Sequence, residues 1–152
     1  ELILEGKVYM AGEESAGMSM IGHVPEKDGL LAGLLAAEMV AARGAGIAKL
    51  REELFAKVGA LYSLREDFRV TPEETERLRA RMKSPPQSLG TRRVAKTTVV
   101  DGLRLDFADG AWLLMRPSGT EPVVRCYVEA PTERDVDDLM RTGRTVLIGG
   151  QS

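Results

Sequence analysis

The chain has 152 residues, of which 43% are hydrophobic and 29% are charged. This length suits one ordinary domain or two small ones, and the composition is that of a folded chain rather than a disordered one. The 21 basic and 23 acidic side chains nearly cancel, which argues against a nucleic-acid footprint or a polybasic membrane face. Any anion site must therefore be local and built from a few donors.

The rarest residue types limit the chemistry further. Cys126 is the only cysteine, so an internal disulfide is excluded, and its place in an alternating strand predicts an inert core side chain. The single histidine, His23, excludes a Cys/His zinc cluster. Neither a basic leader nor an apolar run of roughly 20 residues is seen, so we expect a cytoplasmic protein. Because residue 1 is Glu rather than Met, we also expect a piece of a longer chain.

The first part of the chain is predicted to form a strand, a loop and two helices. The strand covers residues 7–11, and a Gly-rich polar loop occupies 12–29. The carboxylate of Asp28 can accept hydrogen bonds from the first turn of a helix, which we predict over 30–43. Its apolar residues cover more than one stripe, which predicts burial on several sides. A second, amphipathic helix is predicted over 47–58.

A charged connector is predicted over residues 62–70, with a third helix directly after it. Thr71 can cap this helix, Pro72 suits its first position, and Glu74 completes a capping box. The helix is predicted to end near Lys83.

From Val94 the hydrophobic pattern changes to the period of two that is typical of strands. Asp101-Gly102 and Asp109-Gly110 are hairpin signals, because both positions of such turns tolerate positive φ. Thr132 can cap a final helix. The predicted strands cover 94–100, 103–107, 111–115 and 123–130. The second part is therefore predicted to be an α+β arrangement, a small antiparallel sheet with helices, with its boundary between Gly59 and Thr71.

The loop between the last two predicted strands is longer and more polar than the neighbouring hairpins. Its sequence is Arg116-Pro117-Ser118-Gly119-Thr120-Glu121-Pro122. A phosphate is held well by a bidentate arginine, by hydroxyl donors and by backbone N–H groups that a glycine allows to approach. A tight connection would also return Arg125 beside Arg116 as a second cation. The alternative, equally weighted on composition alone, is a polar loop whose arginines face solvent.

A second constellation lies near the amino terminus, in Gly12-Glu13-Glu14-Ser15-Ala16-Gly17. Carboxylates accept from vicinal sugar hydroxyls and serine donates or accepts, so this segment suits a neutral polyol. A nucleophilic role for Ser15 is disfavoured, because the Gly-x-Ser-x-Gly elbow is absent. His23 is more often a structural hydrogen-bonding group than a catalyst, and Lys27 could meet a phosphate or face solvent. A plain surface loop is the alternative for the whole segment.

These two motifs, in this order and at this separation, resemble the α-D-phosphohexomutase superfamily of phosphoglucomutases and phosphomannomutases. The run Gly22-His23-Val24-Pro25-Glu26-Lys27-Asp28-Gly29 is similar to the segment after the sugar loop in bacterial members. The resemblance implies that residues 1–62 end a mixed α/β third domain. It implies that residues 63–152, with a linker helix, form an α+β fourth domain that is TATA-binding-protein-like. It further implies sugar binding by Glu13, Ser15, His23 and Lys27, and phosphate binding by Arg116, Ser118, Gly119, Thr120 and Arg125.

Members of this superfamily are intramolecular phosphotransferases that interconvert hexose 1-phosphate and hexose 6-phosphate through a bisphosphorylated intermediate. A phosphoserine in the first domain transfers the phosphoryl group, and an Asp-x-Asp-x-Asp loop in the second holds Mg²⁺. The sequence has neither a Ser-His-Asn-Pro segment nor that triplet. Asp135, Asp137 and Asp138 sit on a predicted helix, where positions i and i+2 diverge. We therefore expect no catalytic residue and no metal ligand here, so that the fragment alone is inactive. Mg²⁺ and glucose 1,6-bisphosphate are expected for the intact enzyme.

The Glu-Glu-Ser form of the sugar loop goes, in the superfamily, with glucose or mannose phosphates rather than N-acetylglucosamine phosphates. Two rival interpretations stay open: a free-standing sugar-phosphate binding or regulatory module, and a scaffold domain whose loops are merely polar. Because the helix over 30–43 would lack part of its cover in a fragment, we predict that the isolated chain self-associates through it.

Overall fold

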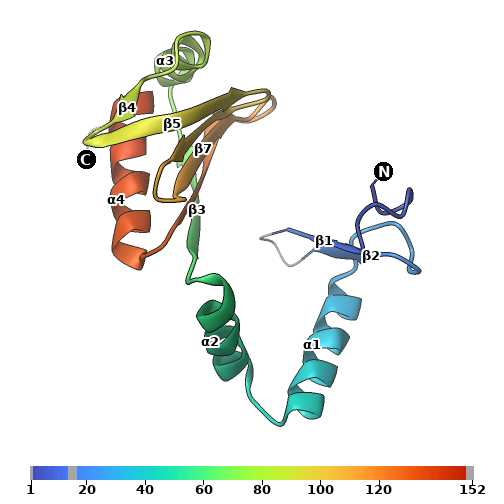
Figure 1. Ribbon diagram of the computed structural model, residues 1–152. Coiled ribbons are helices and arrows are strands. Elements are labelled where there is room, and N and C mark those ends of the chain that lie inside the picture. The colour runs from blue at the N-terminus through green and yellow to red at the C-terminus, as the bar shows by residue number, and fades with distance from the viewer. Residues whose placement is uncertain (1, 14–16, 150–152) are drawn as a thin grey trace. The chain divides into compact units, whose positions relative to one another are not determined.

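The computed structural model describes residues 2–13 and 17–149. The chain divides into two compact units, Glu1–Lys57 and Val58–Ser152. Among the described residues, the first unit holds a two-stranded sheet and two helices, and the second a six-stranded antiparallel sheet with its helices (Figure 1). This arrangement confirms the fold class predicted from the sequence, mixed α/β followed by a small antiparallel sheet with helices.

In the first unit, strand β1 (Met10–Gly12) pairs antiparallel with strand β2 (Met18–Met20). The strand predicted over 7–11 is thus displaced toward the turn, and β2 was not predicted, because three residues are too few to show a period. Helix α1 (Gly29–Arg43) begins after Asp28, whose carboxylate accepts from the amides of Leu30 and Leu31, as predicted. Helix α2 spans Ile47–Val58, also as predicted.

The burial predicted for the helix over 30–43 is wrong in this chain. Leu30 is 84% exposed and Leu34 is 69% exposed, and no residue of α1 or α2 is buried. An apolar helix is buried only where other elements cover it, and the two-stranded sheet of this unit is too small to do so. No single described helix has the length and composition to cross a membrane, whereas α1 and α2 together, bent by 84°, do.

The sheet of the second unit has the strand order β3-β8-β7-β6-β5-β4, and every neighbouring pair is antiparallel. Its strands are β3 (Tyr62–Arg69), β4 (Ser88–Leu89), β5 (Arg92–Val99), β6 (Leu103–Phe107), β7 (Trp112–Pro117) and β8 (Val123–Ala130). Its helices are α3 (Pro72–Lys83), α4 (Glu133–Gly143) and the π-helix η1 (Arg144–Ile148). The capping box of α3, built from Thr71 and Glu74, and the Thr132 cap of α4 are both present as predicted.

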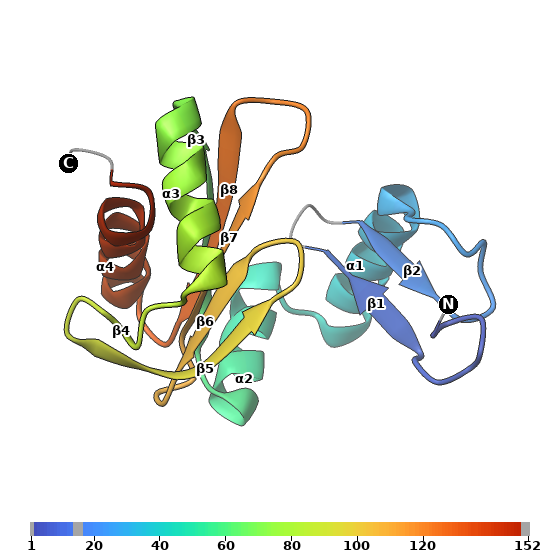
Figure 2. The ribbon, with the colours of Figure 1, turned by 90° about the horizontal axis from the view of Figure 1, so that it is seen from above.

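One face of this sheet forms the core with the helices, and Figure 2 shows α3 and α4 together over the sheet. The strands contribute alternate residues to it, Leu103, Leu105, Leu113, Met115, Val124, Cys126 and Val128, and the helices contribute Leu78, Val136, Leu139 and Met140. Burial, with a smaller effect of the Glu66 charge, raises the pKa of the Cys126 thiol to about 12, so this side chain is inert core packing, as predicted. The opposite face carries charged residues of the same strands, among them Arg65, Arg116 and Arg125.

The segment over 62–70 is not a connector, and that prediction is wrong. It forms β3, an edge strand that pairs with β8 from Tyr62 opposite Ala130 to Arg69 opposite Val123. Phe68 points into the core, whereas Arg65 and Asp67 lie on the other face. Three of the charged residues that suggested a connector, Arg65, Asp67 and Arg69, are the solvent-facing half of an alternating strand. Glu66 lies on the same face as Phe68 but is exposed. A charged edge is how sheets avoid pairing with other chains.

Candidate functional site

The loop over residues 118–122 joins β7 and β8, and the pairing of these two strands brings Arg116 and Arg125 together. Arg116 of β7 lies directly opposite Arg125 of β8, and the Ser118 amide continues the ladder by donating to the Val123 carbonyl at 2.9 Å. Both arginines lie on the face of the sheet that the helices leave open. Like charges directly opposite each other on one face destabilise a sheet. The pair is therefore a place where an anion would relieve repulsion.

The carboxylates around these arginines neutralise them only in part. Asp101 lies 3.3 Å from Arg116 Nε, Asp67 lies 3.8 Å from Arg125 Nε, and Glu121 lies 3.7 Å from Arg125 Nη2. The last two contacts are longer than hydrogen bonds. Arg125 Nε is buried and has no hydrogen-bond partner among the described residues. Such an orphaned cationic donor is expensive unless a further acceptor reaches it.

The loop itself offers hydroxyl and amide donors. Ser118 Oγ accepts from the amides of Thr120 and Glu121, at 3.4 and 3.2 Å, which shapes the turn and leaves the hydroxyl proton able to point outward. Gly119 and Thr120 are exposed, and a Cβ added at Gly119 would meet no atom within 4 Å. A ligand can therefore approach the backbone here without obstruction.

The turn at Asp101-Gly102 packs closely against the backbone of β7. A Cβ at Gly102 would lie 2.6 Å from the Met115 carbonyl oxygen, closer than side chains tolerate, and 3.2 Å from Arg116 Cα. The turn at Asp101-Gly102 is where the sequence predicted it, but the reason was wrong, because Gly102 is not among the glycines with positive φ. Glycine is needed here for close approach, which sets Asp101 beside Arg116.

Sequence reasoning missed Arg69 as a further candidate. It lies opposite Val123, on the same face as Arg125 and one row nearer the loop, so that Arg69, Val123 and Ser118 form the next row across the sheet. Its side chain is exposed and makes no ion pair within the described part of the chain. Period-two alternation of Leu64, Phe68 and Val70 was the signal that could have placed it.

In the first unit, two of the predicted sugar-binding residues are joined to each other and one to the helix cap. Lys27 Nζ lies 3.4 Å from Glu13 Oε1, at the end of the β1–β2 hairpin, where the Glu13 amide donates to Gly17. His23 Nε2 lies 2.9 Å from Asp28 Oδ2, while the other oxygen of that carboxylate caps α1. Ser15 lies outside the described residues. Glu13 and Lys27 are thus held side by side, and His23 is tied to the start of the helix.

The amides of α1 and the imidazole of His23 act on one carboxylate. The Leu31 amide first, and then His23, hold the pKa of Asp28 below its ordinary value, because they hydrogen-bond the charged form. Asp28 therefore fixes the His23 ring and the helix together while it is ionised.

Comparison with known proteins connects both loops to one family. Residues 1–58 match the family model for the alpha/beta/alpha domain III of phosphoglucomutase/phosphomannomutase, and residues 68–142 match the model for the C-terminal domain of the same enzymes. The chain belongs to the phosphoglucomutase/phosphomannomutase family. The resemblance drawn from the two sequence motifs is thereby confirmed.

Relatives of this phosphoglucomutase/phosphomannomutase chain carry different substrate names. It is 29% identical to the phosphoglucosamine mutase of Listeria monocytogenes over 91% of the chain and 27% of that protein. It is 30% identical to the phosphoglucomutase of Komagataeibacter xylinus over 84% of the chain and 26% of that protein. The open form of parafusin, a phosphoglucomutase from Paramecium, shares the fold over 99% of the chain and 33% of its own, with a TM-score of 0.71 at 20% identity. The chain thus spans about a quarter to a third of these three proteins.

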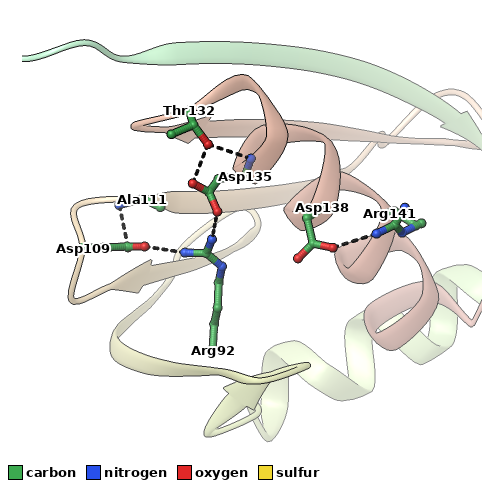
Figure 3. Close-up of polar contacts among 7 residues, drawn as sticks. All are labelled: Arg92, Asp109, Ala111, Thr132, Asp135, Asp138 and Arg141. Carbon is green, nitrogen blue, oxygen red and sulfur yellow. Dashed lines mark hydrogen bonds and ion pairs between the residues drawn. The ribbon is translucent and has the colours of Figure 1, made fainter.

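The Mg²⁺ expected for the intact enzyme of this family does not fit the carboxylates present here. Arg92 bridges Asp109 and Asp135, and Thr132 Oγ1 donates to Asp135 at 2.6 Å, while Asp138 pairs with Arg141 at 2.7 Å (Figure 3). These oxygens are held by cations and a hydroxyl of the chain itself. Nowhere in residues 2–13 and 17–149 do three or more His, Cys, Asp or Glu side chains gather as a metal site would require.

Proposed function

We propose that the chain is the carboxyl-terminal part of a phosphohexomutase that interconverts hexose 1-phosphate and hexose 6-phosphate through a bisphosphorylated intermediate. Its own task would be to bind the sugar hydroxyls and the phosphate that is not being transferred. Catalysis would belong to parts of the enzyme outside these 152 residues, so the fragment alone is expected to be inactive.

The observation that carries this proposal is the Arg116–Arg125 pair beside a hydroxyl-rich loop. Two guanidinium groups on one face can each offer a fork of N–H donors to a phosphate. The negative charge of the phosphate would offset their mutual repulsion. One phosphate oxygen would accept a hydrogen bond from Arg125 Nε, which has no such partner among the described residues. Ser118, Gly119 and Thr120 would add a hydroxyl, an amide and a second hydroxyl.

The sugar hydroxyls would be bound by Glu13, Ser15, His23 and Lys27. Glu13 would accept from two vicinal hydroxyls, and Lys27, 3.4 Å away, would hold its carboxylate in place. A bisphosphorylated sugar must turn over between the two transfers, so both of its ends must satisfy the same donors. Long flexible side chains paired to each other, rather than to the core, suit that exchange.

The preferred hexose is proposed to be glucose or mannose. The Glu-Glu-Ser form of the loop supports this choice, whereas the name of the Listeria monocytogenes relative, a phosphoglucosamine mutase, favours an amino sugar. Glucose 1-phosphate, mannose 1-phosphate and glucosamine 1-phosphate should be titrated in parallel into the chain while the Glu13 and Lys27 resonances are followed. Preference for glucosamine 1-phosphate by more than about tenfold, or about 1.4 kcal/mol, would overturn the choice of hexose but not the phosphate site.

Mg²⁺, a phosphoserine and glucose 1,6-bisphosphate as activator stay proposals for the intact enzyme. So do a cytoplasmic location and the remaining domains as partners of this chain. No residue of this chain is proposed to bind Mg²⁺ or to be the phosphoserine.

Titration with glucose 1,6-bisphosphate tests the proposed role directly. The amide resonances of Gly119 and Thr120 should shift in a saturable manner at millimolar ligand or below, and so should those of the Arg116 and Arg125 side chains. If these amides do not move at millimolar ligand, the chain does not hold the phosphate at this loop, and the scaffold interpretation takes its place.

A further inference from the structure

Four charged side chains succeed one another across the open face of the sheet near the phosphate loop. Asp67 of β3 lies directly opposite Arg125 of β8, which lies directly opposite Arg116 of β7. Asp101 stands beyond Arg116 at 3.3 Å. The row therefore reads acid, base, base, acid, with the two arginines of the proposed site in its middle. The Asp67 and Asp101 carboxylates therefore compete with the anion for the two arginines.

The Asp67 carboxylate accepts its hydrogen bonds from a different arginine. Arg65, two residues earlier on the same strand and face, donates from Nε to Oδ1 at 3.1 Å and from Nη2 to Oδ2 at 3.2 Å. Arg125 Nε, by contrast, is 3.8 Å from the nearer oxygen. The hydrogen bond from Arg65 is also the main reason that the pKa of Asp67 lies below its usual value. Asp67 therefore gives both oxygens to Arg65 and leaves Arg125 without a hydrogen bond.

Arg65 is itself held in place from its other side. Its guanidinium lies 5.5 Å from the centroid of the Tyr127 ring, and Tyr127 is its register partner on β8. A guanidinium stacked over an aromatic ring and forked onto a carboxylate has little freedom to leave. The Arg65–Asp67 pair is thus held in place next to the proposed site.

We infer that Arg65 is a positioning residue of the phosphate site: by binding both oxygens of Asp67, it keeps this acid from hydrogen-bonding Arg125 and so leaves the Arg125 donor open to a phosphate. The inference rests on the proposed function and adds to it the control of affinity by a residue that does not touch the ligand. Without Arg65, the Asp67 carboxylate needs to move only from 3.8 Å to hydrogen-bond distance to pair with Arg125. It would then occupy the donor that a phosphate oxygen needs.

A double-mutant cycle separates this mechanism from a simple loss of positive charge. Binding of glucose 1,6-bisphosphate to the 152-residue chain is monitored by the Gly119 and Thr120 amide shifts. Arg65→Gln should raise the Kd roughly three- to tenfold in the parent chain, yet by less than about twofold when Asp67→Asn is also present, because neighbours that share a partner do not act additively. Arg65→Lys, which keeps the charge but lacks the fork, should also weaken binding.

The matched control is Arg79→Gln, an exposed arginine of α3 that pairs with Glu76 and should leave the Kd unchanged. If Arg65→Gln raises the Kd by the same factor in both backgrounds, or not at all, the inference is wrong while the proposed phosphate site stands. If the parent chain does not bind at millimolar ligand, the proposed function fails and this inference falls with it. All of these residues are exposed or half-exposed, so circular dichroism should confirm that each variant is folded.

Discussion

At the scale of single residues, the pairing of β7 with β8 sets Arg116 directly opposite Arg125. The alternation after Val94 and the length of the loop were enough to place Arg116 beside Arg125, because register in a hairpin depends on loop length. Gly102 was placed in the right turn for the wrong reason. A backbone close approach depends on a strand distant in sequence, which no local pattern reveals. Arg69 was missed because its strand was misread.

Gly102→Ala should destabilise the second unit by about 1–3 kcal/mol, because the added Cβ would force the turn away from the β7 backbone. The close atom is the Met115 carbonyl oxygen at 2.6 Å, which cannot rotate aside as a side chain could. Urea unfolding monitored by tryptophan fluorescence measures the change. Gly119→Ala, whose Cβ meets nothing within 4 Å, should stay within about 0.5 kcal/mol of the parent chain. Equal effects of the two substitutions would contradict the packing described here.

The Asp28 carboxylate should make the start of α1 sensitive to acid. Its folded pKa is lowered by the Leu31 amide and by His23, so its contribution is complete above its unfolded pKa, about 3.9, and is lost as the pH falls through the lowered folded value. The Leu31 amide resonance should therefore titrate with a midpoint below about 3.9. Asp28→Asn should abolish that titration yet keep the helix, since asparagine is as good a cap. A midpoint at or above the ordinary value would show that the cap is not formed.

At the scale of elements, helices were predicted more accurately than strands. The capping residues Asp28, Thr71 and Thr132 lie next to the helices they start, so the signal is local. Strand β3 needed a partner about 60 residues away in the sequence before its pattern made sense, since charge hid its alternation. The two strands β2 and β4 are three and two residues long, which is too short for any periodicity.

Phe68→Ala tests whether β3 is a core strand rather than a connector. Phe68 is 6% exposed, and the Arg144 guanidinium lies 4.8 Å from its ring centroid. Removing a buried ring of this kind should cost about 3–5 kcal/mol in unfolding free energy. Ser63→Ala on the exposed side of the same strand should cost less than about 0.5 kcal/mol. A loss below about 1 kcal/mol for Phe68→Ala would mean that β3 is not part of the cooperative core.

At the scale of the whole molecule, the two units differ in how many apolar side chains they bury, as far as the structure describes them. Every buried apolar side chain that the structure describes belongs to the second unit. The first unit carries the loops that we propose bind the sugar, but its described elements do not cover its helices. Two motifs were enough to predict the family, because each motif is local. The burial of α1 could not be predicted in the same way, since it depends on cover that the described elements of its unit do not supply.

The exposed helices of the first unit should make the isolated chain self-associate. Leu30, Leu34, Ile47 and Leu54 are all more than half exposed, and α1 and α2 line a hollow of about 400 Å³. Apolar patches of this kind drive contacts between copies. Sedimentation velocity should show a concentration-dependent increase in mass, which Leu30→Ser with Leu34→Ser should suppress. A clean monomer at high concentration in the parent chain would refute this expectation.

The central claim is that Arg116 and Arg125 together hold a phosphate, and isothermal titration of glucose 1,6-bisphosphate into the parent chain and its single-arginine variants tests it most directly. Arg116→Gln and Arg125→Gln should each raise the Kd by roughly ten- to a hundredfold, the loss of about 1.5–3 kcal/mol expected for charged hydrogen bonds. Arg141→Gln, which removes an exposed arginine of α4, should leave the Kd unchanged. If the parent and all three variants bind with the same Kd, the phosphate is held elsewhere and the account is wrong.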